Sequence, residues 1–345
     1  MRVKLFLATC FVSLLPLASG ICAPLGITQL VVFGDSLSDT GNAAFGTGGL
    51  LPGPLTHYTP GEFTDGPGTT PATTGPQGIW VDQIAPKLGL AVPQPGFAVP
   101  GGTNFAVGGA DTGTNPSFPG SLQVPFVNQQ LGAYLATNTP SSTSLYSFWA
   151  GADDIADAKN PLTAADNIYA NILALSQAGG KNFLWFDLPP LGQTPDAIAK
   201  GPLGIAAGNA AAAAFDAEWQ TDIYKLLSLG INVIGVDTAS IFNRVTADFN
   251  SGCNVGPLDP FCFANITQPA QGQAVDPNTY LFWDGQHPTT TGQALIADLA
   301  YTDIVDSPEP ASVGMASIGM GLLGAAGIGL FMRKRRADAT SANRA

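Results

Sequence analysis

The stretch LVVFGDSLSDTGN at residues 30–42 decides the fold class. Its first four residues are apolar, with no polar residue between them, which is typical of a parallel strand covered on both faces. Gly34, Asp35 and Ser36 follow at once, and these residue types favour a turn. Because α/β sheets bind ligands at the carboxyl ends of their strands, Ser36 is predicted to lie at the ligand-binding edge. Considered alone, the same residues also suit an ordinary turn.

Apolar runs of this kind recur along the chain and alternate with helical patterns. The expected strands are 28–33, 144–149, 182–187 and 231–236. The expected helices are 79–88, 124–136, 164–177, 205–229 and 289–303. This alternation predicts one α/β domain over 24–303, a three-layer α/β/α arrangement with a doubly wound, mainly parallel central sheet. Residues 42–78 and 250–277, rich in turn formers, are predicted to be long loops.

The charge of the chain excludes one class of partner. The 345 residues carry a formal net charge of -12, and the basic residues gather at the two ends. Between residues 24 and 307, six Lys and Arg face 23 Asp and Glu. Such a body repels phosphate backbones, so no nucleic-acid partner is expected. With two His and four Cys in the whole chain, no His/Cys metal cluster is expected either.

The amino-terminal end has the pattern of a targeting segment. Residues 1–23 begin with two basic residues, continue with an apolar run and end in small residues. This is typical of a secretory signal peptide, with cleavage expected after Gly20 or Ala23. In an exported chain, Cys253 and Cys262 pair most simply as a local disulfide.

The carboxyl-terminal end predicts a membrane segment. A linker at 304–310 contains Pro-Glu-Pro, residues 311–332 carry no charge, and the tail at 333–345 begins with four basic residues. As a helix the uncharged segment would reach about 33 Å, enough to cross a bilayer. The basic cluster would then stay in the cytoplasm, with the main body on the other side.

A second polar cluster precedes the last expected helix. In the stretch FWDGQHP at residues 282–288, Asp284 stands three residues before His287. At this spacing the carboxylate can accept a hydrogen bond from one ring nitrogen and leave the other nitrogen basic. A Ser hydroxyl becomes a good nucleophile when such a base takes its proton. Asp284 and His287 are therefore candidate partners of Ser36, although a His before Pro can also simply begin a helix.

Four blocks, in chain order, resemble the GDSL or SGNH hydrolase family. They are Gly34-Asp35-Ser36-Leu37, NFAVGGA at 104–110, FWAGADD at 148–154 and Asp284-x-x-His287, with 58–88 similar to the segment between the first two. The resemblance implies the SGNH variant of a flavodoxin-like fold, and acyl transfer to water that needs no metal or cofactor.

The resemblance also implies a role for each site residue. Ser36 would be the nucleophile, His287 the general base and Asp284 the group that orients His287. The oxyanion hole would use the backbone N–H groups of Ser36 and Gly109 together with the side chain at position 153.

Position 153 departs from the family pattern. The family has Asn there, whose amide donates to the oxyanion, whereas an ionised Asp153 offers only acceptors. Either Asp153 is held protonated and donates an O–H, or its side chain points away and Ser36 and Gly109 act alone. This departure also supports the alternative of a non-catalytic surface protein that binds exopolysaccharide or the cell envelope.

The carboxyl-terminal tail resembles a PEP-CTERM sorting signal, through its Pro-Glu-Pro triplet, single hydrophobic span and basic patch. That resemblance implies a Gram-negative exporter and removal of the tail by an exosortase-type enzyme. Nine residues after the basic cluster depart from the pattern, and a permanent membrane anchor is the alternative.

The sequence as a whole predicts an exported carboxylic ester hydrolase of the lipase/esterase type. The expected location is the cell surface, the periplasm or the medium. Its ester substrate could be a lipid, a short-chain ester or an acylated polysaccharide. Residues 38–42 resemble the branch with phospholipases and haemolysin-like lipases, which favours lipid or aryl esters. An acyltransferase would use the same residues, so that alternative stays open.

Overall fold

The structure is a computed structural model that describes residues 26–65, 77–113, 124–253, 260–269 and 275–307. The predicted signal peptide, the Pro-Glu-Pro triplet, the uncharged segment and the basic tail lie outside these residues. Within the described ranges, no helix is both long and apolar enough to span a membrane.

Four parallel strands form the central sheet, in the order β1-β2-β3-β4. Their bounds are β1 Gln29–Gly34, β2 Ser144–Trp149, β3 Asn182–Phe186 and β4 Asn232–Val236. The four predicted strands are confirmed, with ends that move by one residue or not at all.

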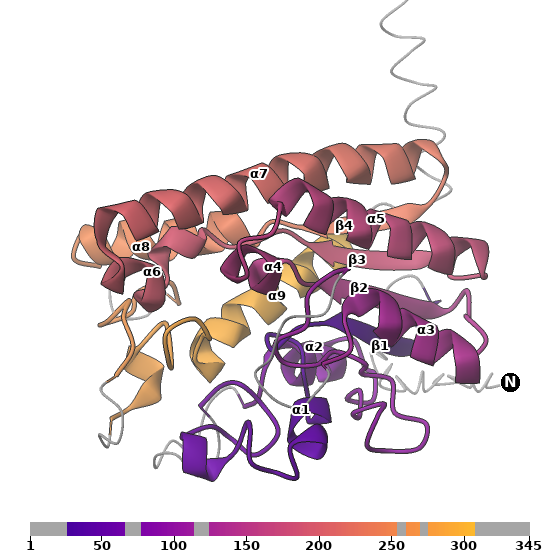
Figure 1. The fold of residues 1–345 in the computed structure, drawn as a ribbon, viewed down its shortest axis with the longest axis horizontal. Coiled ribbons are helices and arrows are strands. Elements are labelled where there is room, and N and C mark those ends of the chain that lie inside the picture. The colour runs from indigo at the N-terminus through magenta and orange to yellow at the C-terminus, as the bar shows by residue number, and fades with distance from the viewer. Residues whose placement is uncertain (1–25, 66–76, 114–123, 254–259, 270–274, 308–345) are drawn as a thin grey trace, which may run out of the picture.

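Helices cover both faces of this sheet. The longer ones are α2 Trp80–Lys87, α3 Val127–Thr137, α5 Pro161–Gln177, α7 Gly201–Ser228, α8 Thr238–Asn250 and α9 Thr290–Asp306. The short helical segments are α1 Asn42–Gly46, η2 Pro54–Thr56, α4 Ala152–Ala156, η3 Leu191–Gln193, α6 Pro195–Ala199 and η4 Pro277–Thr279. Figure 1 shows α5 and α7 along one face, with α2 and α9 on the opposite side.

Alternate residues of β1 serve two separate apolar cores. Val31 and Phe33 pack in a cluster with residues of α3, α5 and α7, whereas Leu30 and Val32 pack with residues of α2, α8 and α9. A strand with apolar neighbours on both faces needs apolar residues at every position, because successive side chains point to opposite faces. The observed layers confirm the predicted α/β/α arrangement.

Residues 103–105 lie beside β1 on the side away from β2, and the direction in which the chain crosses the sheet reverses at β1. The N–H of Val32 donates to the Thr103 carbonyl at 2.9 Å, and the N–H of Phe105 donates to the Val32 carbonyl at 2.7 Å. After β1 the chain thus passes through α2 to the outer edge of β1, then returns through α3 to β2 on its inner side. Right-handed crossovers in opposite directions place their helices on opposite faces. Ser36 follows β1 at this reversal, where doubly wound sheets bind ligands.

Helix α8 is an element that the sequence patterns did not predict. Asp237 caps it, because its carboxylate accepts the Ser240 N–H at 2.9 Å. Ile241, Phe242 and Val245 form its buried side. The Asp cap before this apolar spacing was the available signal, but the Thr and Asn residues around it weaken the helical pattern.

Candidate active site

The end of β1 is held in place before it reaches Ser36. A Cβ atom at Gly34 would lie 2.2 Å from the carbonyl oxygen of Trp149, so only glycine lets β1 and β2 approach this closely. The buried amide of Gln130, from α3, accepts the Gly34 N–H at 3.0 Å and donates to the Gly34 carbonyl at 2.8 Å. Ser36 therefore projects from a strand end that is fixed on two sides.

The three candidate residues Ser36, His287 and Asp284 form one chain of hydrogen bonds. Ser36 Oγ lies 2.8 Å from His287 Nε2, although the two residues are 251 positions apart. His287 Nδ1 lies 2.6 Å from Asp284 Oδ2. The other carboxylate oxygen of Asp284 accepts the backbone N–H groups of Gln286 and His287, at 2.8 and 2.7 Å. In this arrangement one ring nitrogen is oriented by a carboxylate and the other faces the Ser hydroxyl.

The surroundings keep the Asp284 carboxylate ionised. Burial would raise its pKa, but the charge of His287 and hydrogen bonds from His287 and the Tyr58 hydroxyl together lower the pKa of Asp284 to about 2. Phe63 stacks on the imidazole with ring centroids 5.1 Å apart. His287 is buried and packed on one side by an aromatic ring, so its orientation is restricted.

Two backbone N–H groups near Ser36 are available for an oxyanion. Within the described part of the chain, neither the Ser36 nor the Gly109 N–H donates to a protein acceptor. Gly109 has a φ of 79°, a left-handed conformation that favours glycine. The buried carboxylate of Asp39 accepts the N–H of Gly108 at 2.9 Å and that of Asn42 at 2.6 Å. Asp39 therefore connects the turn after the first sequence block to the glycines of the second block by hydrogen bonds.

Asp153, at the position where the sequence resemblance predicts Asn, lines the same cavities as Ser36 and His287. Burial, followed by the charge of Asp35, raises the pKa of Asp153 well above its ordinary value, while the charge of His287 opposes this. Burial also raises the pKa of Asp35 to about 7. The pKa values of the buried Asp35 and the partly exposed Asp153, both beside the candidate nucleophile, are therefore shifted toward the protonated form. A protonated Asp153 can donate a hydrogen bond.

Two cavities meet at Ser36, Asp153, Gln286 and His287. One, of about 410 Å³, extends between α4, α6 and α7 and is largely lined by Pro, Leu, Ala and Gly residues. The other, of about 460 Å³, extends past Phe45, Phe63 and Phe97 toward α1. Lys159, Asp196 and Lys200 also line the first cavity away from this junction. The lining of both cavities is nevertheless mainly apolar, so the Ser hydroxyl lies between two largely apolar compartments.

The structure also contains site residues that the sequence did not single out. Tyr58 bonds to Asp284 directly. Gln130 bonds to Gly34 and Asp39 to Gly108, in the stretches of chain that carry Ser36 and Gly109. Tyr58 and Gln130 carry no local signal, because their partners lie 226 and 96 positions away. Asp39, just after the first block, had a detectable signal as a turn former two residues before Gly41.

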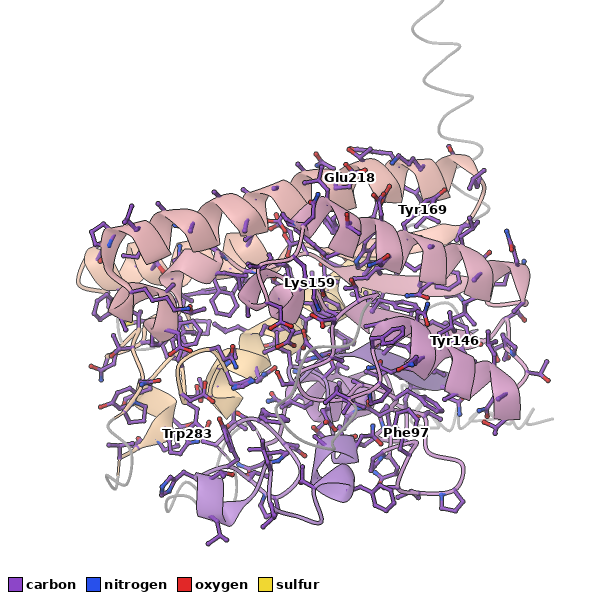
Figure 2. The ribbon with its side chains drawn as sticks, viewed as in Figure 1. Phe97, Tyr146, Lys159, Tyr169, Glu218 and Trp283 are labelled. Atoms are coloured by element: carbon purple, nitrogen blue, oxygen red, sulfur yellow. A yellow bond between two sulfur atoms is a disulfide. The ribbon has the colours of Figure 1, made fainter. Side chains whose placement is uncertain are left out.

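Cys253 and Cys262 form a disulfide in the structure. Among the described residues, one carboxylate group could hold a cation, made by Asp166, Glu218 and Asp222. Lys225 Nζ already lies 2.7 Å from Asp222 and 3.1 Å from Glu218. Figure 2 places Glu218 in the upper helical layer, far from Trp283 in the loop of the candidate site.

The fold and these contacts together define an α/β protein with a candidate hydrolase site at the end of β1. The family described as GDSL-like Lipase/Acylhydrolase matches residues 30–300, and the chain belongs to this family.

Several curated proteins are similar to the chain. Esterase EstA of Pseudomonas aeruginosa is 30% identical over 88% of this chain and 50% of its own length. An uncharacterised Pseudomonas putida protein of the trpE-trpG intergenic region is 29% identical over 83% of this chain and 50% of its own. The thermolabile hemolysin of Vibrio parahaemolyticus is 24% identical over 79% of this chain and 62% of its own. The chain thus spans about half the length of the first two relatives and less than two thirds of the third.

The solved structures that are similar to the chain are more distant in sequence. A member of the lipolytic protein G-D-S-L family from Veillonella parvula is 12% identical, with a TM-score of 0.41 over 79% of this chain and 96% of its own. TesA is 15% identical, with a TM-score of 0.40 over 80% of this chain and 98% of its own.

Proposed function

We propose that this protein is an exported serine ester hydrolase that acts through an acyl-enzyme on Ser36. The observation that carries the proposal is the continuous hydrogen-bond chain from Ser36 through His287 to Asp284. A chain of this kind is what makes a Ser hydroxyl nucleophilic. A non-catalytic protein of the same fold would gain nothing from keeping the chain intact inside an open cavity.

The reaction follows from the positions of these groups. Ser36 Oγ attacks the ester carbonyl carbon while its proton passes to His287 Nε2. The N–H groups of Ser36 and Gly109 receive the oxyanion, and Asp284 stabilises the imidazolium. When the C–O bond to the alcohol breaks, His287 returns the proton to the departing oxygen. Water then attacks the acyl-enzyme by the same steps, which releases the acid and restores Ser36.

The cavities support an ester with apolar groups on both sides of the carbonyl. Each is lined mainly by apolar side chains, and both open on Ser36. A lipid or aryl ester would fill both compartments, whereas an O-acetyl group would leave one of them empty. Lipid or aryl esters are therefore the first substrates to examine.

The deciding experiment is labelling with a fluorophosphonate, which reacts with activated Ser hydroxyls, followed by hydrolysis of p-nitrophenyl esters. Ser36→Ala should abolish labelling and lower turnover by several orders of magnitude, because the three residues act as a unit. Ser228→Ala, at an exposed hydrogen-bonded Ser on α7, is the matched control and should behave as wild type. A folded Ser36→Ala protein that still labels and hydrolyses would exclude Ser36 as the nucleophile.

Transfer of the acyl group to an alcohol is a second candidate reaction. A phosphatidylcholine-sterol acyltransferase of Aeromonas hydrophila is 28% identical over 49% of this chain. The apolar second cavity could hold an acceptor alcohol instead of a leaving group. Adding a long-chain alcohol or a sterol to the hydrolysis assay separates the two, because a transferase forms a new ester at the expense of free acid.

We further propose that the protein is exported and that its carboxyl-terminal tail is processed near Pro308-Glu309-Pro310. The support is the sequence pattern alone: basic, apolar and small residues at the start, and the triplet, uncharged segment and basic cluster at the end. The intact mass of the protein from its native host tests this.

A further inference from the structure

We infer that Tyr58 is a positioning residue for Asp284 and His287, and that it sets the pH at which the site becomes active. Its phenolic O–H donates to Asp284 Oδ2, the same oxygen that bonds to His287 Nδ1. This inference rests on the proposed function, because it concerns how the base of that reaction is tuned.

The Asp284 carboxylate is surrounded by donors from two parts of the chain. Its Oδ1 accepts two backbone N–H groups of its own loop, from Gln286 and His287. Its Oδ2 accepts from the His287 ring and from Tyr58, which lies 226 positions away. Of these four donors, only Tyr58 comes from outside the loop that carries Asp284. It therefore fixes that loop relative to the rest of the site.

Tyr58 is itself held in place by contacts that do not involve Asp284. Its ring meets Phe63 edge-on, with centroids 5.5 Å apart. Just before it, the carbonyl of His57 accepts Trp283 Nε1 at 2.6 Å, and Figure 2 shows Trp283 at the edge of the molecule beside this loop. His57 adopts a left-handed φ of 63°, which is uncommon outside glycine, although His is one of the residue types that adopt it more often.

The loop that carries Tyr58 makes further hydrogen bonds to the chain around His287 just after Phe63. Thr64 Oγ1 donates to the Pro288 carbonyl at 3.0 Å, and Asp65 accepts the N–H of Thr290 at 2.6 Å. The segment from His57 to Asp65 is thus bound to residues on both sides of His287. These attachments hold the Tyr58 hydroxyl against Asp284.

The chemistry of this contact gives the direction of the effect. A hydrogen bond to a carboxylate stabilises its charge and reduces its attraction for a neighbouring imidazolium. Burial, and then the charge of Asp284, raise the pKa of Tyr58, so the phenol stays a donor. The other titratable groups near the pair are Asp35 and Asp153, which act on each other or on His287, and Asp196, which acts on Tyr58. None of these carboxylates would replace the Tyr58 hydroxyl as a hydrogen-bond donor to Asp284 if that hydroxyl were removed.

The test is Tyr58→Phe, which removes the hydroxyl and keeps the ring. We expect the acid limb of the kcat/KM profile to move up by about 0.5 to 1 pH unit, since a bond to a charged group is strong but acts on His287 only through Asp284. Looser orientation of Asp284 should lower kcat about tenfold, with KM within about twofold of wild type.

Tyr134→Phe is the matched control. Its hydroxyl is also buried and bonded to another residue, Tyr146 Oη at 3.3 Å, but it belongs to the core on the other face of the sheet. This variant should melt at a lower temperature and leave the acid limb where it is. A Tyr58→Phe protein whose acid limb coincides with that of wild type would overturn the inference, even if it were less stable.

A readout without turnover keeps this result separate from the proposed function. The chain has two His, so the ring signals can be assigned in NMR spectra with a His57→Gln variant. The titration midpoint of the His287 ring should move upward in Tyr58→Phe, whether or not the protein hydrolyses the esters offered. An unmoved midpoint overturns the inference, whereas a moved midpoint in a protein without Ser36-dependent hydrolysis contradicts the proposed function alone.

Discussion

Replacing Asp153 by Asn tests the position where this chain departs from its family. The side chain lines both cavities beside Ser36 and His287. Burial and the charge of Asp35 raise the pKa of Asp153 well above its ordinary value. Below that pKa the carboxyl group can donate an O–H to the oxyanion, as an amide would. Above it the group is an anion that offers only acceptors and repels the developing charge.

The size of the effect follows from the cost of losing an oxyanion donor, about 10²–10³ in rate. Where Asp153 is protonated, Asn and Asp both donate, so the ratio of kcat/KM for Asp153→Asn to that of wild type should be near one. As the pH rises and Asp153 ionises, wild type alone loses its donor. The ratio should then climb by about 10². The acid limb, which depends on His287, should be shared by the two proteins.

The assay is kcat/KM for a soluble p-nitrophenyl ester across the pH range in which both proteins stay folded, with active sites counted by fluorophosphonate labelling. A ratio of one at every pH would place the side chain of residue 153 outside the oxyanion hole and refute the reasoning. A ratio well below one at every pH, with Ser36 still labelling, would mean that Asp153 transfers a proton, which Asn cannot do.

Two further predictions concern stability and processing. Burial, aided by the charges of Asp216 and Asp237, raises the pKa of Asp187 to about 8, although Thr238 donates a hydrogen bond to it. Because this pKa is higher in the folded than in the unfolded chain, the contribution of Asp187 to the free energy of unfolding is full below about pH 4. It is lost as the pH rises through about 8. Asp187→Asn should therefore flatten the fall in melting temperature between about pH 5 and pH 8, and an unchanged slope would assign that fall to other groups. The native exported protein should have an intact mass that ends near Pro308-Glu309-Pro310, and a membrane-integrated form that still carries the Arg333–Arg336 cluster would indicate a permanent anchor.

Local chemistry made several features predictable. The four strands were readable because strands covered on both faces are apolar at every position, and Leu30–Phe33 shows this pattern. Asp284 and His287 were readable as a pair because one turn of loop can bring residues three positions apart into contact. Three of the four hydrogen bonds to Asp284 come from within that loop. Helix α8 was missed because the sequence pattern around it is weakly helical. Its apolar side is buried in the same core cluster as Ile234 and Val236 of β4, and this packing is not visible in the local sequence.

The sequence by itself determined which residue types could do the chemistry, and where each stood relative to its strand or helix. The tertiary structure alone decided that Ser36 meets His287 across 251 positions, and that Tyr58 reaches Asp284 across 226. It also decided that the pKa of Asp153 is raised, because this shift depends on burial and on the nearness of Asp35, neither of which is a property of neighbours in the chain. Hydrogen bonds and charge interactions act over a few ångströms in space, and only folding sets those distances.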